Sequence, residues 1–215
     1  MNTSGPIEMT VAGVSGVWVP DGYAHQPPSP EPEFDPTRFF DSVRESVFRG
    51  SLNQKQVDGL NLIGQTCKAA DLDPLIEQTA YVLATVFHET AATMQPIEEY
   101  GGKNTRYAPW YGRGHVQLTW EDNYRKQEAK HGHRGTKYRV HDDWNRALDP
   151  EVSATICVYG MKDDDFTGKG LDDYIKPGSV DYVNARRIVN GTDKADMLAV
   201  YAKDFEVALR AGLTR

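Results

Sequence analysis

The feature that most constrains this chain is an almost unbroken apolar run at residues 81–87, which ends at His88, Glu89 and Thr90. A helix that is apolar on every side is stable only when other elements cover it. The sequence therefore predicts a buried central helix from residue 75 to about residue 94, capped by Asp73-Pro74. We expect a domain to be built around this helix.

Glu89 is a carboxylic acid at the end of the buried run, partly out of water. Burial favours the neutral form of a carboxylic acid, and a neutral acid can donate a proton to a leaving group. Glu98 and Glu99 follow on a polar loop, where at least one is expected to stay ionised. An acid and a base in unlike surroundings are the minimal apparatus for hydrolysing a glycosidic bond. The plainer alternative is that Glu89 caps its helix and that the acidic pair is solvated surface.

The pair His88-Glu89 also invites a zinc-protease interpretation. A zinc-protease helix needs a second histidine at the fourth position after the first, and that position is Ala92. The chain has two cysteines, Cys67 and Cys157, which lie in separate helical patterns among apolar neighbours. We expect both thiols to be reduced and buried, and we predict no metal site and no cofactor.

The composition favours a globular protein over a membrane-spanning or nucleic-acid-binding one. The chain has 215 residues, 39% of them hydrophobic, which suits one sizeable domain or a domain with an appendage. No apolar run approaches the ~18 residues of a membrane helix, and the N-terminus lacks a secretory signal pattern. We therefore expect no membrane span and synthesis in the cytoplasm. Residues 1–35 hold five of the 31 acidic residues and no Lys or Arg, so the rest is nearly neutral and does not indicate nucleic-acid binding.

Residues 1–35 are predicted to form an extended N-terminal arm and a proline-rich linker. Apolar residues alternate near residues 7–11 and again near 17–19, which suggests one or two short strands. Six of the twelve prolines lie in residues 20–36, a composition that cannot hold a core. One interpretation is a docking strand that adds to the sheet of a partner. The other is a disordered tail.

Residues 36–215 are predicted to form one mainly α-helical domain. Asp35-Pro36 and Asp149-Pro150 indicate helix starts, because a capping side chain precedes a proline in the first turn. Ser51 with Gln54 resembles a capping box, and Ser179 is expected to cap a later helix. The predicted helices cover approximately residues 36–50, 52–70, 75–94, 120–130, 150–161, 180–190 and 194–209, with a short helix near 142–146.

Several motifs together resemble glycoside hydrolase family 19, which includes plant-type chitinases and many phage endolysins. They are His88-Glu89-Thr90, the turn WYGRGHVQLTW at residues 110–120, Asn123-Tyr124 and Ile188-Val189-Asn190-Gly191. The resemblance covers residues 50–212, approximately, and is greatest to the phage and prophage branch, because the loops are short and the plant disulfides are absent. It implies a lysozyme-like, two-lobed helical fold with a small β turn or hairpin at the cleft.

By this resemblance, Glu89 is the general acid of an inverting mechanism in which a second carboxylate activates water. The longer loop that carries this carboxylate in plant members is missing here. Glu99 is favoured as the base, and Glu98 is kept as the alternative. Thr105, six residues after Glu99, is expected to help hold the water.

The resemblance also implies contacts to the substrate. Thr119 is expected to hold the attacking water with the base, and Gln117, Asn123 and Asn190 to bind sugar hydroxyl or N-acetyl groups. One departure is Thr192, which stands where the family has a second glycine after Asn190-Gly191. Sugar rings are expected to stack on Trp110, Tyr111 and Trp120. A carboxylate of the site is expected to be reached by Arg113 and by Arg186 or Arg187. His88 is a further candidate because it adjoins the acid. Tyr111 and Trp120 also suit an ordinary core, and His88 suits a structural role.

The hypothesis from sequence is an endolysin or lysozyme-type glycoside hydrolase that cleaves β-1,4 bonds between N-acetyl sugars of bacterial peptidoglycan. It would be made in the host cytoplasm and act at the bacterial cell wall. Two alternatives stay open. One is a chitinase that acts on chitin oligomers. The other is a virion-associated wall-binding component, docked to a phage structural partner through residues 1–35.

Overall fold

The computed structural model describes residues 7–11, 14–18, 33–72 and 75–213. The chain divides into two compact units, Met1–Glu33 with Arg215, and Phe34–Thr214. This division falls two residues before the boundary expected from the sequence. Phe34 belongs to the second unit because it forms a β-bridge with Leu213, near the other end of that unit.

The described part of the first unit is a β-hairpin. Strands β1 (Ile7–Val11) and β2 (Val14–Trp18) pair in an antiparallel fashion, with Ile7 opposite Trp18 and Val11 opposite Val14. Strands therefore occur near the predicted positions, although β2 begins three residues before residue 17. The proline-rich stretch expected to act as a linker lies largely outside the described residues.

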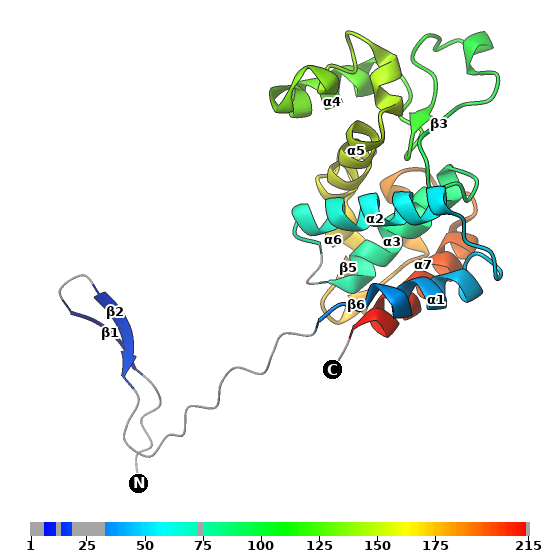
Figure 1. Ribbon diagram of the computed structural model, residues 1–215. Helices are drawn as coiled ribbons and strands as arrows, with labels where there is room; N and C mark the ends of the chain where they lie inside the picture. The colour runs from blue at the N-terminus through cyan, green and yellow to red at the C-terminus, as the bar shows by residue number, and fades with distance from the viewer. Residues whose placement is uncertain (1–6, 12–13, 19–32, 73–74, 214–215) are drawn as a thin grey trace. The chain divides into compact units, whose positions relative to one another are not determined.

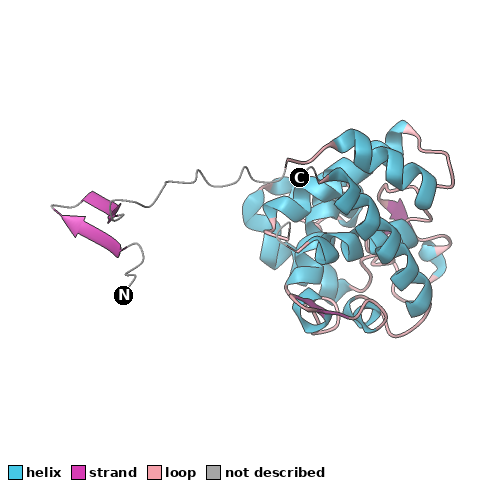
Figure 2. Ribbon diagram, turned by 90° about the horizontal axis from the view of Figure 1, so that it is seen from below, coloured by secondary structure: helices cyan, strands magenta, loops and turns pink. Residues whose placement is uncertain are grey.

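The second unit is mainly helical, as predicted (Figures 1 and 2). Its α-helices are α1 (Pro36–Ser46), α2 (Gln54–Ala69), α3 (Ile76–Glu89), α4 (Glu121–His131), α5 (Pro150–Lys162), α6 (Leu171–Tyr174) and α7 (Ala195–Gly212). Two short antiparallel pairs accompany them, β3 (Ile97–Glu98) with β4 (Arg113–Gly114), and β5 (Ile175–Lys176) with β6 (Ser179–Val180). Across the described ranges, no helix is long and apolar enough to cross a membrane.

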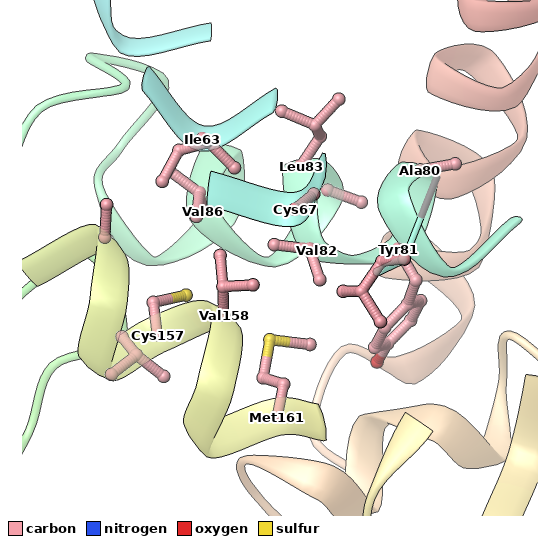
Figure 3. Close-up of a cluster of buried hydrophobic side chains, with 14 of the residues drawn as sticks. Ile63, Cys67, Ala80, Tyr81, Val82, Leu83, Val86, Cys157, Val158 and Met161 are labelled. Carbon is pink, nitrogen blue, oxygen red and sulfur yellow. The ribbon is translucent and has the colours of Figure 1, made fainter. Parts of the chain in front are cut away.

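Helix α3 is the buried centre of this unit, as the apolar run predicts. All its residues from Gln78 to Val86 are buried. Helix α7 packs against both α3 and α1, and α2 packs against α3 and α5. Figure 3 shows side chains of the three helices α2, α3 and α5 converging, among them Ile63, Val82 and Met161. Figure 1 shows α4 at the opposite end of the unit from α1 and α7, with α5 between them.

Both cysteines lie in this core, where Cys67 and Cys157 are reduced and buried as expected. Burial raises the pKa of the Cys157 thiol, because the thiolate would have no water around it. These side chains therefore behave as small hydrophobic groups.

The end of α3 differs from the prediction. The helix stops at Glu89 rather than near residue 94, because Ala91, Ala92 and Met94 have positive φ angles that leave the helical region. The hydroxyl of Thr90 donates to the Val86 carbonyl and accepts from the Met94 amide, so it holds this turn. Glu89 therefore stands at a helix end and not inside a helix. The expected cap Asp73-Pro74 lies outside the described residues.

Two of the other predicted helix caps are confirmed and two are wrong. Asp35 and Asp149 cap α1 and α5 through their side chains, as predicted. The capping box of α2 is wrong by two residues, because Asn53 and Gln56 exchange the two bonds expected of Ser51 and Gln54. The predicted helix after Ser179 is also wrong. Ser179 lies in β6, and the predicted helical segment contains a 3-10 turn at Asn184–Ile188 in place of an α-helix.

Candidate functional site

Glu89 is held at the end of α3 by a buried cation. Its Oε1 accepts a hydrogen bond from Arg186 Nη1 at 2.7 Å, and the two side chains are 16% and 3% exposed. Arg186 is fixed in turn by a bond from its Nε to the Asp193 carbonyl at 3.1 Å. Of the two arginines expected to reach a carboxylate, Arg186 does so, and its guanidinium orients one oxygen of Glu89 at the end of the apolar run.

Glu89 lines a pocket of about 510 Å³. Five other residues expected at the site line it too, although they come from separate segments: Gln117, Thr119, Trp120, Asn123 and Asn190. The remaining lining residues are apolar or aromatic: Tyr107, Val116, Leu118, Phe166 and Val189. The structure thus brings together residues that are far apart in the sequence, with α3 supplying the carboxyl group.

Gln117 and Thr119 reach the pocket from a tight turn. The amide and carbonyl groups of Arg113 pair with those of Leu118, and Gln117 has a φ of 53° inside the loop that this pairing closes. Gln117 Nε2 donates to the carbonyls of Ile97 and Gly114 at 3.1 Å each. Those bonds fix the side chain and leave its carbonyl oxygen as the group that a ligand can meet.

Thr119 and Asn123 also use their donors within the protein. The Thr119 hydroxyl donates to the Gln117 carbonyl at 2.8 Å, and Asn123 Nδ2 donates to the Thr119 carbonyl at 2.8 Å. Asn190 has the opposite arrangement, because its Oδ1 accepts from the Gly191 amide at 2.8 Å. This wall therefore offers mainly oxygen acceptors, with the Asn190 amide as a donor. Such a wall suits a ligand that is rich in hydroxyl and amide donors.

The two loop acids point to different surroundings. Glu99 accepts from the Gly112 amide at 2.8 Å and from the Tyr107 hydroxyl at 2.9 Å, and Tyr107 lines the pocket. Glu98 is 42% exposed, accepts from the Tyr111 hydroxyl and lies 3.7 Å from Arg113 Nη2. Adjacent residues of an extended segment face opposite sides. Neither acid lines the pocket itself, but Glu99 is joined to it through Tyr107.

Gly112 keeps Glu99 close to the pocket. A Cβ atom at this position would lie 2.8 Å from Gln117 Oε1 and 3.2 Å from Glu99 Oε2. Any side chain would therefore push apart the favoured base and a residue of the pocket wall.

Three predicted aromatic or cationic contacts lie outside the pocket lining, with Tyr111 and Arg113 buried and Trp110 half-buried. Trp110 stacks on His141 with ring centroids 5.0 Å apart, and it also meets Tyr124 and Trp144. Tyr111 is buried, with the Arg113 guanidinium 3.8 Å from its ring centroid. Arg113 donates to the carbonyls of Pro109 and Tyr111. The structure therefore places these three side chains in the support of the turn and not in the pocket.

His88 and Thr105 also lie outside the pocket lining. Burial lowers the pKa of His88 below its ordinary value of 6.5, and the neighbouring Glu89 carboxylate opposes this shift. The Thr105 hydroxyl donates to the Gly102 carbonyl at 2.7 Å, where it closes a 3-10 turn. The Thr105 hydroxyl therefore has a structural contact in this arrangement.

Sequence reasoning missed Tyr107 and Phe166, which line the pocket. Tyr107 and Trp120 have ring centroids 4.8 Å apart, and Arg106 Cζ lies 5.3 Å from the Trp120 ring centroid. Trp120, a predicted stacking residue, is 46% exposed and offers a partly open aromatic surface at the pocket. Tyr107 lies three residues before the motif at residues 110–120, so its position could have indicated it. No sequence pattern connects Phe166 with that motif.

Comparison with known proteins gives no relative. No protein-family model, no curated protein and no solved structure matches this chain.

Proposed function

We propose that the helical unit is a lysozyme-like, two-lobed glycoside hydrolase that cleaves β-1,4 bonds between N-acetyl sugars of bacterial peptidoglycan. The observation that carries this proposal is the pocket in which Glu89 lies with Gln117, Thr119, Asn123 and Asn190. Oxygen acceptors, one amide donor and a partly open tryptophan are what a pyranose ring with an acetamido group requires. The protein acts at the cell wall.

In the proposed reaction, Glu89 donates its proton to the oxygen that bridges two sugars. The bond between the anomeric carbon and this oxygen breaks as a water attacks the carbon from the opposite face. Arg186, bonded to Glu89 at 2.7 Å, stabilises the carboxylate that the proton leaves behind.

Glu99 is the base in this mechanism. The Tyr107 hydroxyl lines the pocket and donates to Glu99 at 2.9 Å. Tyr107 passes this proton to Glu99 and takes up a proton of the attacking water in its place. The hydroxyl oxygen of Thr119 accepts a hydrogen bond from the same water and orients it. The water oxygen ends on the anomeric carbon, so the product has inverted configuration.

The test is digestion of purified peptidoglycan and of chitin oligomers, with mass analysis of the fragments and NMR of the anomeric proton. Glu89→Gln is expected to remove activity, while Glu45→Gln, at an exposed site on α1, should act like the parent. Fragments heavier by one water and of inverted configuration support the proposal. Equal rates for Glu89→Gln and the parent would refute the assigned acid. Faster cleavage of chitin would favour the chitinase alternative.

A second role is favoured by the separate N-terminal unit. A two-stranded hairpin is marginally stable alone, and β1 and β2 belong to a unit distinct from the helical one. We propose that this hairpin docks the enzyme to a phage structural protein. Co-sedimentation of the full chain with phage particles, and its loss on deletion of residues 1–33, tests that role.

A further inference from the structure

A buried carboxylate outside the pocket joins α4 to the loop after α5. The side chain of Asp165 is 4% exposed, and Lys130 Nζ donates to its two oxygens at 3.0 and 2.9 Å. Gln127 Nε2 donates to Asp165 Oδ2 at 3.3 Å, and Lys126 Nζ donates to the Asp165 carbonyl at 2.6 Å. Hydrogen bonds with charged partners are among the stronger ones. We call these four residues the Asp165 cluster.

The Asp165 cluster adjoins the pocket wall both on α4 and on the loop after α5. Asn123 lies three and four residues before Lys126 and Gln127, so these side chains share one face of α4. Asn123 lines the pocket, and so does Phe166, which follows Asp165 in the chain. The cluster therefore connects two residues that belong to separate elements of the pocket wall.

Phe166 has a second anchor on α5. A Cβ atom on Gly160 would overlap atoms of the Phe166 ring, so the ring lies directly on the backbone of α5. The Asp165 amide also donates to the Gly160 carbonyl at 3.0 Å. The segment at Phe166 is thus held by α5 on one side and by the Asp165 cluster on the other.

We propose that Asp165 is a positioning residue that fixes Phe166 relative to Asn123, and thereby sets the fit of a pyranose ring in the pocket. Asp165 is not among the residues that line the pocket, so its effect is on binding and not on bond cleavage. The sugar-binding part of this inference rests on the proposed function. The anchoring of Phe166 does not.

The first measurement is calorimetric titration of the full chain with tri-N-acetylchitotriose. Asp165→Asn keeps the shape of the side chain and removes its charge. We expect its Kd to rise about tenfold, and KM for the oligomer to rise equally while kcat stays unchanged. The matched control is Asp163→Asn, which removes the other carboxylate bonded to Lys130, at 2.9 Å. Its Kd should change less than about twofold, because it does not adjoin a pocket residue.

A double-mutant cycle tests whether Asp165 acts through Phe166. In a Phe166→Ala background, Asp165→Asn should have no further effect on Kd, because the residue it positions has lost its ring. An equal effect in both backgrounds overturns the inference. Should Asp165→Asn fail to fold, Lys130→Gln carries the same expectations, since it removes two bonds to Asp165 from a partly exposed position.

Amide hydrogen exchange without sugar separates this inference from the proposed function. The amides of residues 165–168 should exchange about tenfold faster in Asp165→Asn than in the parent or in Asp163→Asn. Unchanged exchange overturns the positioning role. A parent that binds no sugar overturns the proposed function, and the exchange result then decides the role of Asp165.

Discussion

Replacing Arg186 with methionine tests the ion pair that orients Glu89. The two side chains meet at 2.7 Å, and the guanidinium is almost fully buried. Removing one partner of a buried ion pair costs about 3–5 kcal/mol, because the other charge is left uncompensated. Glu89 reaches the pocket, where water can solvate it, so we expect the lower end of that range. Arg186→Met should reduce the free energy of unfolding by about 3 kcal/mol.

Urea denaturation at pH 7 measures this loss, with Arg187→Met as the matched control. Arg187 is the exposed neighbour, with a 3.5 Å contact to Asn184. Its replacement should change the free energy of unfolding by less than about 0.5 kcal/mol. We also expect kcat/KM of Arg186→Met to fall by about 100-fold, because the acid loses its orientation. A loss of stability below about 1 kcal/mol would refute the ion-pair reasoning.

Arg186 also bonds the Asp193 carbonyl, at 3.1 Å, and this bond contributes to the same loss. A cycle with Glu89→Gln separates the two contributions. If the ion pair dominates, the double variant should be more stable than the sum of the single effects by about 1–2 kcal/mol. Strictly additive effects would assign the loss to the Asp193 bond.

Three further predictions concern the base, acid stability and the hairpin unit. Glu99→Gln should lower kcat on peptidoglycan by about 100-fold or more and Glu98→Gln by less than about threefold; two mild losses would remove the base assignment. Burial lowers the pKa of His115 to about 4, so the unfolded chain binds the proton more tightly below pH 6.5. His115 should therefore contribute a loss of stability of up to about 3 kcal/mol between pH 6.5 and 4, and His115→Phe should reduce the measured loss by that amount in urea titrations, while His131, whose pKa burial also lowers to about 4, continues to contribute. Deleting residues 1–33 should leave the melting temperature and wall digestion unchanged; unfolding would show that the hairpin belongs to the core.

The predictions that succeeded depend on local chemistry. The apolar run at residues 81–87 is stable only in the interior, and α3 is buried from Tyr81 to Val86, with Phe87 partly buried against the core. Asp35 and Asp149 cap their helices through contacts two or three residues away. Such features can be found in a sequence because the interacting groups are also neighbours along the chain.

The predictions that failed depend on distant contacts. Ser179 has the chemistry of a cap, but its segment pairs with Ile175–Lys176 and becomes a strand. Trp110 and Tyr111 have the chemistry of sugar-stacking residues, but Trp110 stacks on His141 and Tyr111 is buried against Arg113, so neither lines the pocket. The expectation that Arg186 or Arg187 reaches a carboxylate agrees with the structure, but Arg186 lies 97 residues from Glu89, so the sequence could not choose between the two arginines.

The same distant contacts determine how charge is arranged at the site. Glu89 has the Arg186 guanidinium as its partner, whereas Glu99 is bonded to two neutral donors, Tyr107 and Gly112. In the proposed reaction, positive charge develops on the sugar ring as the glycosidic bond breaks. The carboxylate without a cationic partner is the one whose charge stays available to that ring and to the attacking water. The neutral partners of Glu99 therefore favour it as the group that meets the attacking water, whereas Arg186 stabilises the carboxylate that Glu89 becomes once its proton has left.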